Sequence, residues 1–169
     1  RRGLADDDLV VDVAPGYILQ AGLPYSRSQI AVILDAAPAD VPERYRDEER
    51  ARKLVGTLAD AVPRGGTVIA PAKEWEVQDY ARDGGCRVAI FATDDDVTDR
   101  DKKLARVVAL VSAGRILIEH DDGVTDAGAL RDDAPAAAQV AAALAMFVLE
   151  AMARATPSPS GAADAQPAR

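Results

Sequence analysis

The first residues that could do chemistry form an acidic run. Asp94, Asp95 and Asp96 are consecutive, and Asp99 and Asp101 follow them. Carboxylate oxygens are the ligands that Ca²⁺ prefers. The run lacks the 12-residue loop spacing, with its closing Glu, of the common calcium-binding loop. We therefore interpret it as a solvated acidic loop, with calcium binding as the alternative.

Two single residues are further candidates. His120, the only histidine, precedes Asp121 and Asp122 and could form an acid–base pair with them, although a surface histidine at the end of an edge strand is the preferred interpretation. Cys86, the only cysteine, could be a reactive thiol, but no second histidine supports that role, and a half-buried structural cysteine is favoured. One cysteine forms no internal disulfide, and one cysteine with one histidine makes a poor zinc site. The expected location is a reducing cytoplasm.

Composition limits the classes of function. The 169 residues are 49% hydrophobic and 28% charged, as expected for one globular domain. A net charge of −8, a pI near 4.6 and no block of Lys or Arg argue against a nucleic-acid partner. No apolar run approaches the roughly 20 residues that a membrane span needs, so no membrane partner is expected. The chain opens Arg1-Arg2-Gly3 without Met, which suggests a sequence cut from a longer protein.

Apolar runs and turn residues predict alternating strands and helices. Strands are predicted at 9–13, 29–34, 67–70 and 87–92, and helices at 42–62 and 73–83. Alternation of this kind implies parallel pairing, because each crossover helix must pack back onto the sheet. Near-continuous apolar strands imply helices on both faces of that sheet.

The later part of the chain has a different pattern. Residues 106–112 and 115–120 flank Ala113-Gly114 and predict an antiparallel hairpin at the edge of the sheet. Residues 134–153 predict a helix, and 154–169 a disordered Pro/Ser/Ala tail that looks like a true terminus. The predicted fold is α/β and Rossmann-like: a mostly parallel sheet with helices on both faces and an antiparallel edge hairpin, in one domain over 1–153.

Common nucleotide-binding loops are missing from the chain. The phosphate loop Gly-x-x-x-x-Gly-Lys-Ser/Thr does not occur, and no Gly-x-Gly-x-x-Gly follows any predicted strand. The turn Ala14-Pro15-Gly16 has one glycine where a dinucleotide fingerprint needs three. A generic dinucleotide-binding fold therefore finds little support.

Several segments, in order, resemble the central domain of the Mur ligase family, and above all the Mur-like half of cyanophycin synthetases. Residues 11–19, Val-Asp-Val-Ala-Pro-Gly-Tyr-Ile-Leu, are similar to that family's Glu-x-Ala-Arg-Gly-Gly-Ile-Leu, and a Gly-Leu pair and the apolar run 30–34 follow. Residues 60–69 resemble Glu-Ala-Val-x-Pro-x-Gly-Thr-x-Val, and 139–145 resemble the late helix Asn-x-x-Asn-Ala-Leu-Ala. The resemblance covers about residues 8–150, without an upstream phosphate loop, so the domain would be incomplete at its N-terminus.

This resemblance implies ATP-dependent amide-bond formation with Mg²⁺. The family's magnesium-binding Glu falls on Asp12, and Gly16 is the glycine retained near the nucleotide. The Asn-x-x-x-Asp-His run becomes Asp35 to Asp40, with Ala39 in place of the Asp that precedes the His and Asp40 in place of the His. Asp35 and Asp40 could hold a hard cation through oxygen. The alternatives are a turn carboxylate for Asp12 and a helix-start carboxylate for Asp40.

Other family positions depart from the pattern. The family's modified lysine falls on Val55, with Lys53 two positions away on another helix face. The nucleotide-contacting Asn-x-Asp-Asp becomes Pro-Ala-Lys-Glu at 71–74, and the His-Asn pair of the late helix becomes Ala138-Gln139. These departures predict that ATP and Mg²⁺ binding is lost or incomplete.

Two hypotheses of different classes follow. In the first, the chain is a piece of a cyanophycin-synthetase-like ligase that needs a phosphate loop and a closing domain from outside these residues. In the second, it is a ligase-derived pseudoenzyme that serves as a structural or protein-interaction module. We favour a catalytically incomplete homologue whose partners are copies of itself or other domains of a larger synthetase. The sequence does not identify the substrate.

Overall fold

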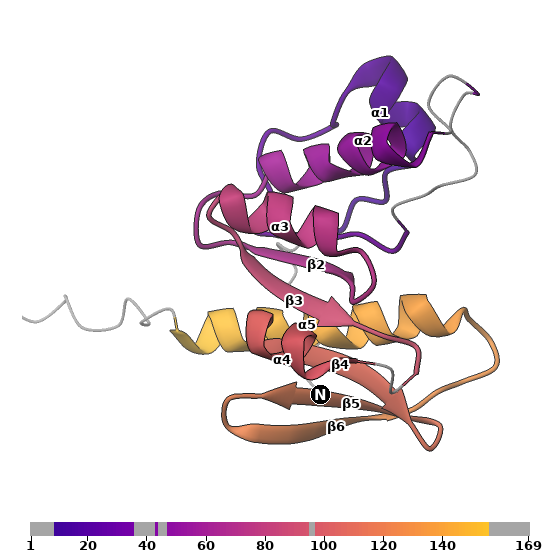
Figure 1. Cartoon of the computed structure of the whole chain (residues 1–169), viewed down its shortest axis with the longest axis vertical. Coiled ribbons are helices and arrows are strands. Elements are labelled where there is room, and N and C mark those ends of the chain that lie inside the picture. Colours follow the sequence, from indigo (N-terminus) through magenta and orange to yellow (C-terminus); the bar gives the residue numbers. More distant parts are fainter. Residues whose placement is uncertain (1–8, 36–42, 44–46, 95–96, 156–169) are drawn as a thin grey trace, which may run out of the picture.

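The structure is a computed structural model, and it describes residues 9–35, 43, 47–94 and 97–155. Six strands form one mixed sheet in the order β1-β2-β3-β4-β5-β6 (Figure 1). The strands are β1 (Ile30–Val32), β2 (Thr67–Pro71), β3 (Arg87–Phe91), β4 (Val107–Ser112), β5 (Arg115–His120) and β6 (Gly123–Ala129). The helices are α1 (Pro15–Ala21), α2 (Glu48–Asp60), α3 (Trp75–Asp83), α4 (Asp99–Leu104) and α5 (Ala136–Ala155).

The first four strands are parallel and the last two are antiparallel. β1 pairs with β2, β2 with β3, and β3 with β4, all in parallel. β5 and β6 then add in antiparallel fashion beyond β4. This arrangement confirms the predicted α/β class and its mostly parallel sheet.

Alternating side chains of the parallel strands are buried on opposite faces of the sheet. On one face, Val68 and Ile90 pack with Val55 of α2 and Val77 of α3. On the other face, Ile69 and neighbouring strand residues pack against α5. Helices therefore cover both faces of the sheet, as the apolar strands predicted. In Figure 1 α2 and α3 lie side by side, and α5 lies apart from them, along the strands.

Helix α2 forms where an acidic start precedes an apolar stripe. The side chain of Asp47 accepts a hydrogen bond from the Arg50 N–H at 3.2 Å and caps the helix. Gly56 lies buried in the middle of the helix, and a Cβ there would meet the Tyr80 ring at 3.5 Å. The glycine lets α2 and α3 approach closely, and the Tyr80 hydroxyl donates to Asp60 at 2.8 Å. The predicted helix is confirmed over 48–60.

The predicted hairpin is also confirmed. Residues Ala113 and Gly114 both have positive φ, 49° and 73°, as a two-residue turn between antiparallel strands requires. Residues 123–129, for which no element was predicted, form β6, so β5 is an interior strand. Two of the seven β6 residues are glycine, and its burial is low, so its sequence carries little strand signal.

Two predictions near the start of the chain are wrong. Residues 9–13 form no strand: Leu9 is 85% exposed and Val10 72% exposed, and no described strand pairs with them. The expected turn at Pro15-Gly16 is instead the first turn of α1, because proline at the start of a helix loses no intrahelical hydrogen bond. Ile18 of α1 packs against Leu54 of α2.

The remaining differences between prediction and structure are one additional helix and the end of α5. Helix α4 was not predicted, because its six residues follow the acidic run with little apolar pattern. Helix α5 continues to Ala155, two residues beyond the predicted boundary. The rest of the expected tail, 156–169, lies outside the described residues, as do 36–42 and most of 43–46.

Helix α5 is also the one described helix that is long and apolar enough to cross a membrane by length and composition alone. In the structure Val140, Ala141, Leu144 and Val148 on this helix are buried against the sheet. These contacts hold one side of the helix on the sheet, and 22% of the apolar window is buried in the structure.

Replacing Leu144 with Ala tests this packing. Leu144 is fully buried, so we expect Leu144→Ala to lower the free energy of unfolding by about 2–5 kcal/mol. Leu104→Ala is the matched control, because Leu104 is 48% exposed, and we expect a change within about 0.5 kcal/mol. Urea titrations followed by the fluorescence of Trp75 measure both, and equal losses would contradict the packing of α5 on the sheet.

Candidate functional site

Ligands of open α/β sheets bind where the carboxyl ends of the parallel strands meet. At this edge Asp35 follows β1, the turn 72–74 follows β2, and Asp94 follows β3. The order β1-β2-β3-β4 continues without reversal through the described strands. A dinucleotide usually binds in the crevice where the strand order reverses, and these strands form no such crevice. Any ligand site at this edge therefore depends on the side chains that lie there.

The four residues proposed from the sequence do not form one described cluster. Asp12 is exposed in the irregular segment before α1, and Gly16 is within the first turn of that helix. Asp35 is exposed after β1 and takes part in an interaction of its own. Asp40 lies outside the described residues. Among the residues that are described, no group of three or more His, Cys, Asp or Glu side chains is placed to hold a metal ion.

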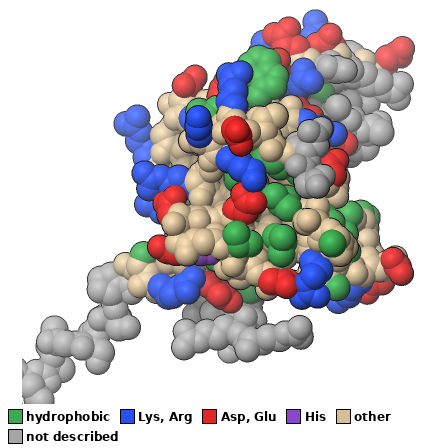
Figure 2. All heavy atoms as spheres, turned by 60° about the horizontal axis from the view of Figure 1, so that its bottom comes forward, with side chains coloured by type: hydrophobic (Ala, Val, Ile, Leu, Met, Phe, Trp, Pro, Cys, Tyr) green, Lys and Arg blue, Asp and Glu red, His purple; other side chains and the backbone are tan. Residues whose placement is uncertain are grey.

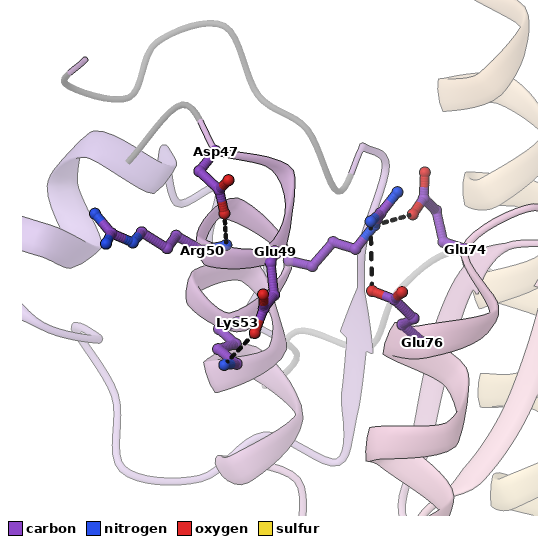
Figure 3. Close-up of polar contacts among 7 residues, drawn as sticks. Asp47, Glu49, Arg50, Lys53, Glu74 and Glu76 are labelled. Atoms are coloured by element: carbon purple, nitrogen blue, oxygen red, sulfur yellow. Dashed lines mark hydrogen bonds and ion pairs between the residues drawn. The ribbon is translucent and has the colours of Figure 1, made fainter. Parts of the chain in front are cut away.

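The clearest polar cluster at this edge joins α2 to the turn after β2 (Figure 3). The Arg52 Nε lies 3.3 Å from a carboxylate oxygen of Glu74, and its Nη1 lies 3.4 Å from a carboxylate oxygen of Glu76. Glu74 is 8% exposed, so its charge is largely removed from water. A buried carboxylate needs such a partner, because desolvation of an unpaired charge is costly.

The carbonyls of the same turn are also engaged. The Gln78 side chain is 2% exposed, and its Nε2 donates to the Pro71 carbonyl at 2.9 Å and to the Ala72 carbonyl at 3.0 Å. The Ala72 N–H donates to the Phe91 carbonyl at 2.8 Å. The segment that would contact a nucleotide by resemblance is therefore held by internal hydrogen bonds.

Val55, on which the family's modified lysine falls by resemblance, and the nearby Lys53 lie in different environments on α2. Val55 is 2% exposed and belongs to the core beneath α2. Lys53 is at the surface, where its Nζ lies 2.7 Å from Glu49, and this hydrogen bond raises the pKa of Lys53. A shallow surface pocket of about 620 Å³ lies here, lined by Glu43, Asp47, Glu49, Arg50 and Lys53. Within it Lys53 pairs with Glu49, and the Asp47 carboxylate accepts the Arg50 backbone N–H.

Gln139 acts within its own helix start. The side-chain oxygen accepts from the Arg131 N–H at 3.0 Å, and the Nε2 donates to the carbonyls of Arg131 and Ala134, each at 2.7 Å. Both ends of the amide are used to hold the loop that enters α5. Gln139, which the resemblance places at the start of the late helix, therefore has a structural role in this chain.

His120 is bound by its neighbours in the β5–β6 hairpin. Its Nε2 lies 3.0 Å from the Thr125 hydroxyl, and its Nδ1 accepts the backbone N–H of Asp122 at 3.3 Å. The ring lies 4.9 Å from the ring of Phe147 on α5. Because the contact with Asp122 is made by the backbone, the acid–base pair considered from the sequence is not formed.

A second surface pocket, of about 410 Å³, lies beside His120 between α4 and β5. Lys102, Lys103 and Arg106 line it together with Glu119 and Asp121. The Lys102 Nζ is 2.8 Å from Glu119, so part of the positive charge is already neutralised. The pocket has charges of both signs and no distinct ligand preference.

The acidic run is partly accounted for by helix capping. Thr98 and Asp101 form a capping box at the start of α4: the Asp101 N–H donates to the Thr98 hydroxyl at 3.2 Å, and the Thr98 N–H donates to the Asp101 carboxylate at 3.1 Å. Asp95 and Asp96 lie outside the described residues. The Asp101 carboxylate is thus engaged in local structure.

Cys86 is a half-buried thiol near the end of α2. Its Sγ lies 3.7 Å from the Val62 carbonyl and 4.0 Å from the Ala59 carbonyl. Burial, and to a smaller extent the charge of Asp60, raise the pKa of the Cys86 thiol. A raised pKa keeps the thiol protonated, which is the opposite of what an activated nucleophile needs.

The described side chains at these positions do not fit a triphosphate with Mg²⁺. The Glu74 carboxylate is paired with Arg52, and Val55, where the resemblance would put a modified lysine, is a buried valine. On the face seen in Figure 2, Lys/Arg and Asp/Glu side chains are interspersed rather than gathered into one charged patch. We derive no chemical step through ATP or a metal here.

The Arg52–Glu74 pair was not predicted from the sequence. The two residues are 22 positions apart, so no local spacing connects them, and their contact depends on how α2 packs beside α3. A basic residue on the exposed face of a helix is common. The one available signal was Glu74 in a turn after a buried strand.

Comparisons with known protein families and with curated proteins find no match to this chain.

Removing Arg52 tests whether Glu74 depends on it. We expect Arg52→Met to lower the free energy of unfolding by about 1–3 kcal/mol, since it leaves a largely buried carboxylate unpaired. The double variant Arg52→Met/Glu74→Gln should recover much of that loss. Lys53→Met is the control on the same helix, and loss of its fully exposed pair should leave stability essentially unchanged. Equal losses in urea titrations of the Arg52 and Lys53 variants would contradict the structural role of the pair.

Thiol reactivity tests the environment of Cys86. We expect the rate of alkylation by iodoacetamide to rise with pH along a curve whose midpoint lies above that of a free cysteine, because the folded thiol has a raised pKa. Asp60→Asn removes the smaller cause and should move the midpoint slightly down, leaving most of the shift. A midpoint below that of a free thiol would show an activated cysteine instead.

Proposed function

We propose that the chain is a partial or degenerate Mur-ligase-like domain, related to ATP-dependent amide ligases such as cyanophycin synthetase, that does not catalyse amide formation on its own. The observation that carries the proposal is the occupied turn after β2. There the Arg52–Glu74 pair and the Gln78 hydrogen bonds engage the groups that would otherwise contact a nucleotide.

The order of the elements supports the relationship. Parallel strands and helices alternate up to β4, an antiparallel hairpin follows, and a long helix covers the second face of the sheet. The quoted segments of the resemblance fall on the irregular residues 11–14 with α1, on β1, on the end of α2 with β2, and on α5, in that order. An active ligase of this kind would need a phosphate loop and a closing domain beyond these residues.

A second candidate function is a non-catalytic structural or protein-interaction module. It is favoured by exposed apolar residues at one edge of the sheet, where Val32 is 37% exposed and Leu34 49% exposed. The coding sequence upstream of Arg1 discriminates between the two. A Gly-Lys-Ser/Thr loop there supports a ligase fragment, and its absence favours the interaction module.

Isothermal titration calorimetry tests the loss of nucleotide binding. With ATP and Mg²⁺ added to the chain, we expect no saturable heat, or a Kd weaker than about 1 mM. We also expect no release of phosphate from ATP when amino acids are supplied. Circular dichroism of the same samples shows that the chain is folded. Saturable binding with a micromolar Kd would overturn the proposal that this chain lacks a working ATP site.

A further inference from the structure

The two edges of the sheet differ in how they are protected against pairing. The β6 edge carries a register irregularity opposite Ile116 and Leu117, an Asp126 that pairs with Arg115 at 2.7 Å, and Gly128 with a φ of 121°. Bulges, charges and glycines of this kind discourage a further strand. The β1 edge has none of them along its run Ile-Ala-Val-Ile-Leu at 30–34.

The backbone of β1 has one row of groups that faces away from β2, at the edge of the described sheet. The Gln29 carbonyl accepts from the Thr67 N–H at 3.0 Å, and the Ile33 N–H donates to the Ile69 carbonyl at 2.8 Å, so the odd-numbered residues face β2. The even-numbered residues therefore direct their backbone groups to the outer edge. The Ser28 hydroxyl donates to the Ile30 carbonyl there, and among the described strands β1 pairs only with β2, so none of them lies along its outer edge.

The same chain carries a segment suited to such an edge. Residues 9–11, Leu-Val-Val, have high strand propensity, yet Leu9, Val10 and Val11 are 85%, 72% and 41% exposed. Val13 is anchored against the cluster of Ile18 and Leu54, so the apolar segment extends from a fixed point. An exposed apolar strand former and an unprotected apolar edge are complementary.

We propose that residues 9–11 of one copy pair with the outer edge of β1 in a second copy, and that the exchange is reciprocal. A symmetric exchange covers the exposed segment 9–11 and the outer edge of β1 in both copies with one repeated kind of contact. Two exchanged strands, with the edges and side chains that they cover, would bury on the order of 1,200 Å² in total, near the lower limit for specific interfaces. The inference goes beyond the proposed function, because it requires no nucleotide and holds for either candidate.

The charge of the chain gives the association a characteristic salt dependence. Each copy has a net charge of −8, so two copies repel each other at low ionic strength. Added salt screens this repulsion and strengthens apolar contact. The dimer should therefore tighten as NaCl is raised, which distinguishes it from an association driven by opposite charges.

Analytical ultracentrifugation of the full chain over a range of micromolar concentrations tests the proposal. We expect a monomer–dimer equilibrium that Val10→Pro weakens about tenfold or more, since proline removes a backbone donor and leaves the segment apolar. Val32→Asp on β1 should weaken it similarly. Val10 is 72% exposed, so its variant should remain folded, and circular dichroism checks both.

Val124→Asp is the matched control, because Val124 is an apolar residue, 62% exposed, on the opposite edge strand β6. We expect no change in the dimer constant. A synthetic peptide with the sequence of residues 8–14 should compete with dimer formation. A monomer at every concentration, or equal weakening by the β1 and β6 variants, would overturn the exchange, whatever calorimetry with ATP shows.

Discussion

Strands β2 and β3 are flanked by strands on both sides and buried on both faces, and the rest of the molecule is arranged around this requirement. Val68, Ile69 and Ile90 are completely buried, so side chains that alternate between the faces all need a cover. Helices α2 and α3 cover one face, and α5 covers the other. Because consecutive parallel strands lie side by side, crossovers of one hand place their connections on a single face. The second face is then left to a helix from the end of the chain.

This requirement explains how much could be predicted. The apolar strands at β1 to β4 and the stripe of α2 were recognised because burial on two faces or along one stripe leaves a periodic pattern in sequence. Residues 9–13 have the same pattern but no neighbouring strand in the structure, and a strand cannot form without a partner. β6 has a partner but little pattern, since it is an exposed edge. The failures thus concern pairing, which local sequence does not encode.

The candidate site shows the same limit at the level of side chains. Asp35 and the turn after β2 were located from the sequence, because strand ends place them at the carboxyl edge of the sheet. The pairing of Glu74 with Arg52 was not, because it arises from the contact of α2 with α3. Gln139 and His120 were noticed for their chemistry, yet their hydrogen bonds serve a helix start and a hairpin. The role of such a polar residue depends on its neighbours in space, and the sequence alone does not show which residues these are.

The Arg52–Glu74 pair also has a consequence for how such a site could change. A carboxylate that contacts a nucleotide must be free to direct its oxygens at the ligand, whereas Glu74 is largely buried and faces a guanidinium. Separating the pair would leave a charge without a partner in a poorly solvated place, and breaking a buried pair destabilises proteins by about 3–5 kcal/mol when burial is complete. Here Arg52 keeps 28% of its side chain exposed, so the penalty is smaller. Stability and nucleotide contact therefore place opposite demands on the same carboxylate, and in this chain the pairing of Glu74 with Arg52 serves stability.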